Sequence, residues 1–264
     1  MASPDEAAQR DDWDRHWLDY SDAAEQNPAQ RYRRRVVFDL LALGNGPARV
    51  LDVGSGQGDF AAELLRRHSG AQLLGLEVSE AGIEISRRKA PGANFVQRDL
   101  TQPEEPEPQQ RGWATHTVCS EVLEHVDNPR ELLVNAAPYM APGCRLVVTV
   151  PGGPMSAFDR HIGHRRHFSP EDLGTLLTEA GFEVEMASGA GFPFFNLYRM
   201  VVILRGRRLV EDVSGGGTGS ESRLARAVMA AFRPLFRLNR LRGGRGWQTV
   251  AAAHRGAVEA SARG

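Results

Sequence analysis

The chain has 264 residues, of which 41% are hydrophobic and 25% are charged, and its formal net charge is -1 at pH 7. This length predicts one large domain with a substantial core. The near-neutral charge excludes a general electrostatic attraction to nucleic acid or to an anionic membrane, so only local patches could provide one.

Export is not expected from this sequence. The N-terminus is acidic and polar and lacks the apolar run of a secretory signal, and no stretch reaches the roughly 18 apolar residues of a membrane-spanning helix. The two cysteines, Cys119 and Cys144, lie in apolar runs typical of buried free thiols. Without a disulfide framework, the cytoplasm is the expected location.

Residues 1–45 are interpreted as an N-terminal helical lid. Residues 1–12 are expected to be disordered, and residues 13–43 carry helical apolar spacing. Asn27 is a candidate N-cap, followed by a proline at the first helical position. The arginines at 31 and 33–35 are expected to form a solvated face. The alternative is that Tyr32 or one of these arginines covers a ligand pocket.

Residues 46–190 alternate between strand and helix patterns and are assigned to an α/β core. Strands are expected at 49–53, 71–77, 94–98, 114–119, 144–150 and 182–188, and helices at 58–68, 79–90, 129–140 and from Ser169-Pro170 to Gly181. Such alternation predicts a parallel sheet with helices on both faces. Right-handed crossovers then give a doubly wound, Rossmann-like fold. A last strand near 246–251 makes the sheet seven-stranded and mostly parallel.

Residues 191–245 are predicted to be an insert before the last strand, and residues 246–264 to be that strand and a tail. From Arg223 to Arg245 the insert has seven arginines and no acid, interleaved with apolar residues. This pattern predicts a basic amphipathic helix, kinked at Pro234. It could cover an acceptor pocket, lie on an anionic membrane with Phe194, Phe195 and Tyr198 as anchors, or contact an anionic partner such as RNA.

The most informative stretch is residues 49–60, RVLDVGSGQGDF. It has a buried strand, then glycines at 54, 56 and 58, then the start of a helix. Glycine allows positive φ and lets a ligand approach the backbone closely. A strand that ends in such a loop forms a nucleotide-sized pocket at the carboxyl edge of the sheet.

Two motifs resemble one family. The pattern D-x-G-x-G-x-G from Asp52 to Gly58 is similar to the first motif of class I S-adenosylmethionine (SAM)-dependent methyltransferases. The segment Cys119–Pro129, CSEVLEHVDNP, closely resembles that of the ubiquinone-biosynthesis O-methyltransferase type and its small-molecule relatives. The resemblance covers about residues 48–187. It implies SAM as the cofactor and a methyltransferase activity.

The resemblance also implies positions for the donor. Asp52 would bind the ammonium group of SAM, Glu77 the ribose hydroxyls and Asp99 the adenine amino group. The full set of expected cofactor-binding residues is Asp52, Gly54, Ser55, Gly56, Gly58, Glu77, Val78, Asp99, Leu100, Ser120 and Glu121.

Histidines are the candidate catalytic residues, because imidazole can take a proton near neutral pH. His125, His161, His164 and His167 are the candidates for base or substrate contact, and we expect His164 to face the acceptor. The motif E-x-x-E-H also resembles that of small-RNA 3′-terminal 2′-O-methyltransferases, which bind a divalent metal. Here the corresponding set is Glu121, Glu124, His125 and His164. The simpler interpretation, which we favour, is that Glu121 is oriented near SAM, Glu124 caps the following turn and His125 is a packed histidine.

The expected reaction is methyl transfer to a small-molecule acceptor, at the hydroxyl of a phenol or quinol, a sugar or a specialised metabolite. The alternatives are N-methylation of a small amine, a lipid-linked or membrane-associated substrate, or a non-catalytic SAM-binding protein. A nucleic-acid acceptor is disfavoured by the near-neutral charge. Peripheral membrane contact would involve residues 192–245.

Overall fold

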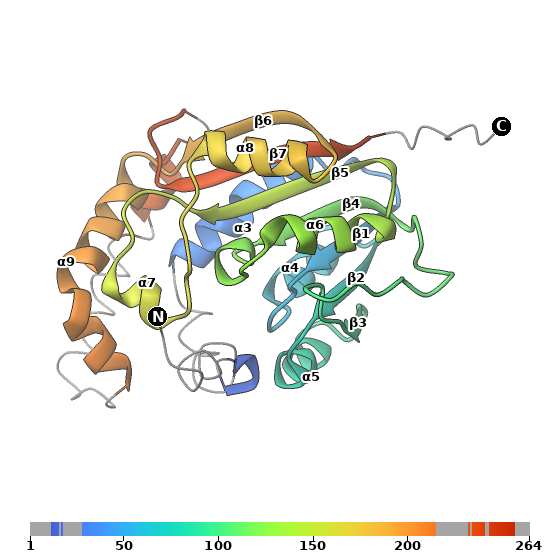
Figure 1. Ribbon diagram of the computed structural model, residues 1–264, viewed down its shortest axis with the longest axis horizontal. Helices are drawn as coiled ribbons and strands as arrows, with labels where there is room; N and C mark the ends of the chain where they lie inside the picture. The colour runs from blue at the N-terminus through green and yellow to red at the C-terminus, as the bar shows by residue number, and fades with distance from the viewer. Residues whose placement is uncertain are drawn as a thin grey trace.

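The computed structural model describes residues 12–15, 17, 28–214, 232, 234–240 and 243–256, with the backbone alone for 205–214. The helices and strands are shown in Figure 1. In chain order they are α3 (Pro28–Leu41), β1 (Ala48–Val53), α4 (Asp59–Arg67), β2 (Ala71–Glu77), α5 (Glu80–Lys89), β3 (Asn94–Gln97), β4 (Ala114–Ser120), η1 (Leu123–His125), α6 (Pro129–Ala136), η2 (Ala137–Tyr139), β5 (Met140–Pro151), α7 (Ala157–His161), α8 (Pro170–Glu179), β6 (Phe182–Ala190), α9 (Phe194–Ser214), η3 (Phe236–Leu238) and β7 (Gln248–Arg255).

The predicted seven-stranded, doubly wound sheet is confirmed. Its strand order is β3-β2-β1-β4-β5-β7-β6. Strands β1 to β5 pair in parallel, whereas β7 runs antiparallel to both β5 and β6. The order reverses beside β1, so the carboxyl ends of β1 and β4 border the crevice in which open α/β sheets bind ligands.

Alternating side chains along the strands build two apolar cores, one on each face of the sheet. Val50, Val118 and Val147 belong to the core that contains α3, α4 and α5. Their neighbours Leu51 and Cys119 belong to the core that contains α6 and α8. This alternation follows from the two-residue period of a strand. A parallel sheet covered on both sides needs apolar residues at every position, which explains the continuous apolar runs in the sequence.

Local signals set several boundaries. Ser79 accepts a hydrogen bond from the Gly82 amide and caps α5, and Ser169 forms a capping box with Asp172 at the start of α8. One boundary differs from the prediction. The helix expected to end at residue 140 ends at Ala136, because the proline at 138 has no amide hydrogen for a helical hydrogen bond, and the chain tightens into the 3-10 turn η2. Strand β5 therefore begins at Met140.

Two predicted segments lie mainly outside the described residues. These are the disordered start at residues 1–11, together with Asn27, and most of the basic helix expected from 221 to about 241. Within the described part of that helix, Phe236–Leu238 forms the 3-10 turn η3. Among all described residues, no helix combines the length and apolar character that a bilayer crossing requires.

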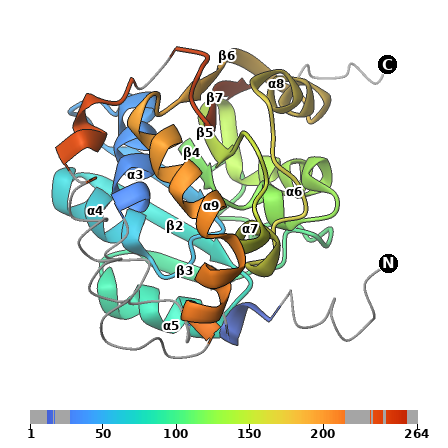
Figure 2. The same cartoon turned by 90° about the vertical axis from the view of Figure 1, so that its left-hand side faces the viewer.

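Helix α9 forms one end of the molecule and packs against α7 (Figures 1 and 2). The contact contains a buried ion pair, in which Arg199 of α9 donates to both carboxylate oxygens of Asp159 of α7 at 2.9 and 2.8 Å. The two side chains are 9% and 1% exposed. A bidentate pair of this kind fixes the rotation of α9 about its own axis.

The rotation of α9 corrects two expectations. Phe195 is only 1% exposed and packs with Tyr32 and Phe236, and Tyr198 packs on Phe236. Phe195 is therefore not available as a membrane anchor, and Phe194 and Tyr198 are partly buried against the same core. Tyr32 is also buried there and does not cover a pocket as a lid.

We expect Arg199→Met to lower the free energy of unfolding by about 3–5 kcal/mol, because the buried Asp159 carboxylate loses its partner. Urea denaturation would measure this loss. Burial opposes ionisation, yet Arg199 and Ser156 hold the pKa of Asp159 well below its usual range. The contribution is therefore complete above the unfolded pKa of about 4 and declines as the pH falls below it.

The exposed Arg111→Met is the matched control and should change stability by less than about 0.5 kcal/mol. A loss below about 1 kcal/mol in Arg199→Met, or an equal loss in the control, would contradict this account.

Candidate active site

The glycine loop after β1 has the conformation that its sequence predicts. Gly54, Gly56 and Gly58 have φ values of 68°, 54° and 80°, which favour glycine. The amides of Gly54 and Ser55 donate to the carbonyl of Leu76 at 2.8 and 3.1 Å. A Cβ at Gly54 would lie 2.5 Å from a methyl group of Val122, so the loop also needs glycine to approach the segment after β4.

A cavity of about 530 Å³ lies beside this loop, at the carboxyl ends of the strands. Six of the predicted cofactor-binding residues line it: Gly54, Glu77, Val78, Asp99, Leu100 and Glu121. The other five predicted residues lie outside its lining: Asp52, Ser55, Gly56, Gly58 and Ser120. A volume in this range suits a small molecule and not a polymer.

Two acids lie at the carboxyl ends of β1 and β2. Glu77 accepts hydrogen bonds from the amides of Gly56, Val78 and Ser79 at 2.7, 3.1 and 3.0 Å. Asp52 is 4% exposed, and its Oδ2 has no hydrogen-bond partner among the described residues. Burial, with a smaller effect from the charge of Glu77, raises the pKa of Asp52 to about 7. A cation bound beside Asp52 would restore its charge.

The N-terminal segment packs on the glycine loop. The sequence predicted a lid in this part of the chain, but not the residues that make the contact. Trp13 and Trp17 line the cavity. The ring of Trp13 lies edge-on to His125, with 4.8 Å between centroids. Asp14 accepts hydrogen bonds from the Ser79 hydroxyl at 2.6 Å and the Ala81 amide at 3.1 Å. The spacing of four between the tryptophans was the available signal, but it predicted only an apolar helix face.

Glu121 is held by side chains from three other elements. Its carboxylate pairs with Arg33 of α3 at 2.9 Å and accepts hydrogen bonds from Gln248 of β7 at 2.7 Å and Thr149 of β5 at 3.2 Å. Its φ of 59° is unusual for a residue other than glycine. Such strain persists only where the surroundings impose it. Arg33 thus has a specific partner and is not part of a solvated face.

The predicted histidines occupy different environments. His125, in η1, lines the cavity. His164 lies behind it, with 4.7 Å between ring centroids, and does not line the cavity. His161 is the exposed last residue of α7, a short helix where the sequence predicted a loop. His125, and not His164, is therefore the predicted histidine that borders the cavity.

His164 and His167 lie behind His125, and their hydrogen-bond partners determine which ring nitrogens carry hydrogen. His167 Nδ1 lies 2.9 Å from the Gly153 carbonyl and must donate to it. Burial lowers the pKa of both His164 and His167, that of His164 to about 2, so both rings are neutral. His167 Nε2 is then an acceptor, and His164 Nδ1 donates to it at 3.3 Å. This leaves a lone pair on His164 Nε2.

Part of the predicted metal set comes together. Glu124, His125 and His164 each offer a ligand atom, and these atoms lie within 4.8 Å of one another. Glu124 is fully buried, neither of its oxygens has a hydrogen-bond partner among the described residues, and burial raises its pKa well above the usual value. Such a group is protonated or binds a cation, so the three residues fit a divalent ion. Glu121 is outside this group.

Other cavity residues were not singled out from the sequence. Arg98, Asn128, Glu131 and Arg165 all line the cavity. Arg165 lies in the histidine segment, where its amide donates to the Glu124 carbonyl at 2.8 Å and its guanidinium pairs with Asp127. The signal for Arg165 was its position beside His164, but only the turn after α7 shows which side chain faces the cavity.

Comparison with known proteins gives the family. Residues 24–187 match the family described as "Methyltransferase domain". The chain is 34% identical over 134 residues to the trans-aconitate 2-methyltransferase of Methylobacterium nodulans, covering 49% of each protein. It is 27% identical over 195 residues to the ubiquinone biosynthesis O-methyltransferase of Acinetobacter baylyi, covering 67% of this chain and 79% of that one. The chain thus spans about half the length of the first of these relatives.

A solved structure shows the same fold. The geranyl diphosphate C-methyltransferase of Streptomyces coelicolor, in complex with Mg²⁺, geranyl-S-thiolodiphosphate and S-adenosyl-L-homocysteine, superposes with a TM-score of 0.54 at 16% identity. The superposition covers 86% of this chain and 76% of that one. These findings confirm the resemblance inferred from the two motifs. The chain therefore belongs to the methyltransferase domain family of SAM-dependent enzymes.

Proposed function

We propose that the protein transfers the methyl group of SAM to a hydroxyl oxygen of a small-molecule acceptor. The observation that carries this proposal is the position of His125. It lines the same cavity as Gly54, Glu77 and Asp99, which the family motifs assign to the donor. A proton acceptor and the donor site thus share one space, as displacement at a sulfonium methyl by a hydroxyl requires.

The donor end supplies charge and hydrogen bonds. Asp52 would bind the ammonium group of SAM, and a neighbouring cation would favour its ionised form. Glu77, fixed by three backbone amides, would accept from the ribose hydroxyls. Asp99 lines the cavity, and its Oδ1 accepts from the Thr101 amide at 2.9 Å, which orients the carboxylate for the adenine amino group.

The acceptor end combines apolar walls with a base. Trp13, Val126 and Leu132 give apolar surface, which excludes water from the reacting atoms. His125 would take the hydroxyl proton as the oxygen attacks the methyl group. The neutral His164 behind it adds no positive charge that would disfavour a protonated His125.

A second candidate mechanism follows from the buried Glu124. A divalent cation bound by Glu124, His125 and the His164 Nε2 lone pair would lower the pKa of an acceptor hydroxyl. The orientation of His164 by His167 and the Gly153 carbonyl is typical of metal-binding histidines. The two roles of His125, base and ligand, exclude each other.

We expect SAM affinity to fall as the pH falls below about 7, because the Asp52 proton must leave before the carboxylate can bind an ammonium group. Calorimetric titration with SAM at pH 6, 7 and 8 measures this. The dependence should approach tenfold per pH unit at the acid end and should disappear in Asp52→Asn. An unchanged pH dependence in that variant would remove Asp52 from this role.

His125→Ala should lower kcat by about 10²–10⁴-fold with little change in SAM affinity, because a general base acts on the chemical step. His161→Ala, at an exposed position outside the cavity lining, is the matched control and should retain activity. Release of S-adenosylhomocysteine across phenols, catechols, sugars and lipid-linked sugars would identify an acceptor for this comparison. Equal activity in both variants would contradict the proposal.

Chelation separates the two mechanisms. If His125 is the base, turnover should survive exhaustive treatment with a chelator. Loss of turnover that Mn²⁺ restores in the wild type but not in Glu124→Gln would instead support the metal. Calorimetric titration with Mn²⁺ alone measures metal binding independently of activity. The control for loss of a nearby charge is Glu131→Gln, because the exposed Glu131 carboxylate also lines the cavity.

A further inference from the structure

We propose that the end of the molecule formed by α9 and η3 docks on an anionic phospholipid bilayer. This inference goes beyond the proposed function and does not depend on it. Among the described residues, seven large apolar side chains are exposed, and five of them lie at this end: Phe192, Leu197, Met200, Leu204 and Leu238. Scattered exposed apolar residues are normal, but a concentration of this kind marks a contact surface.

Three of the five form a continuous stripe on α9. Leu197, Met200 and Leu204 are 47%, 46% and 81% exposed. Spacings of three and four place them on one helical face. The opposite face carries Phe195 and Arg199, both buried. Because the Arg199–Asp159 ion pair fixes the helix rotation, the stripe must face outward.

A basic hollow of about 370 Å³ lies at the same end. Arg31, Arg35 and Arg237 line it, all three are exposed, and no acidic residue of the described part of the chain belongs to its lining. Pro28, which also lines the hollow, is the first residue of α3, so the positive end of that helix dipole adds to the potential. Three guanidinium groups beside a helix start favour a phosphate group.

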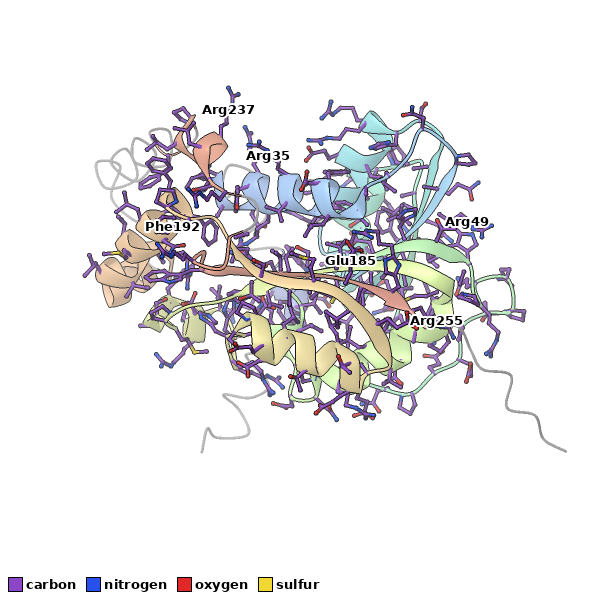
Figure 3. The ribbon with its side chains drawn as sticks, turned by 90° about the horizontal axis from the view of Figure 1, so that it is seen from above. Arg35, Arg49, Glu185, Phe192, Arg237 and Arg255 are labelled. Atoms are coloured by element: carbon purple, nitrogen blue, oxygen red, sulfur yellow. The ribbon has the colours of Figure 1, made fainter. Side chains whose placement is uncertain are left out.

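Turn η3 lies between the hollow and α9, and its Phe236 packs on Phe195 and Tyr198 of that helix. This turn contacts both α3 and α9, its residue Arg237 lines the hollow, and the adjacent Leu238 is 66% exposed. Figure 3 shows Arg35 and Arg237 at the same end of the molecule as Phe192, whereas Arg49 lies at the other end. Apolar side chains bordered by arginines are the combination that inserts at the headgroup boundary of an anionic membrane.

The apolar component distinguishes this surface from a nucleic-acid site. Binding to phosphates of nucleic acid needs basic residues but gains little from exposed leucine and methionine. A bilayer uses both, because the acyl region takes up the apolar stripe while the lipid phosphates neutralise the arginines. Leu197, Met200 and Leu204 thus replace Phe195, which the sequence suggested and the structure buries, and Tyr198, which is partly buried on Phe236.

Flotation of the full chain with vesicles tests the proposal. The probes are phosphatidylcholine vesicles with and without 30 mol% phosphatidylglycerol, at low and high salt. We expect binding to the anionic vesicles, weakened by salt. Arg35→Glu/Arg237→Glu should lower partitioning at least about tenfold, and Leu204→Asp should lower it at either salt concentration.

Matched controls place the same changes elsewhere. Val134→Asp alters an exposed apolar residue of α6, and Arg111→Glu alters an exposed arginine in the loop before β4. Both should bind like the wild type, and thermal melts should show that every variant is folded. Three outcomes would overturn the proposal: no vesicle binding by the wild type, equal loss in the control variants, or a wild-type dimer that Leu204→Asp converts to a monomer without any vesicle binding.

Discussion

The carboxylate of Glu121 is the point at which the parts of this molecule meet. It lies at the end of β4 in a backbone conformation that few residues adopt, and it is bound by side chains of α3, β5 and β7. Helix α3, the parallel half of the sheet and the antiparallel strand β7 are therefore joined at one partly buried carboxylate. Because that carboxylate also lines the cavity, the same contacts that close the fold shape the site.

The other buried carboxylates of the site differ in whether the protein supplies their hydrogen-bond partners. Glu77 is satisfied by three backbone amides, whereas Asp52 and Glu124 retain buried oxygens without partners among the described residues. A buried carboxylate without a partner is costly unless it is protonated or meets a cation. The unsatisfied groups thus mark where ligands bring charge, and the satisfied one marks where the protein supplies a fixed hydrogen-bond acceptor.

The sheet and the glycine loop could be predicted because their signals are local. The alternation of strands and helices and the spacing of Gly54, Gly56 and Gly58 all lie within short stretches of chain. Contacts between distant segments could not be predicted in this way. Partners more than 30 residues away determine the positions of Trp13, Phe195 and His164. The sequence around each of these residues was compatible with a side chain that faces either the core or the surface. Periodicity identified apolar helix faces without showing what covers them.

The carboxylate of Asp14 accepts hydrogen bonds from Ser79 and Ala81 at the start of α5. This contact has a consequence for the fluorescence of the protein. Two of the four tryptophans lie close to it: a Cβ on Gly56 or Gly82 would contact the Trp17 ring, and Trp13 contacts His125. An indole in such a position changes its emission when its surroundings exchange water for a ligand. The protein therefore carries its own optical reporter for a ligand that enters the cavity, without any added label.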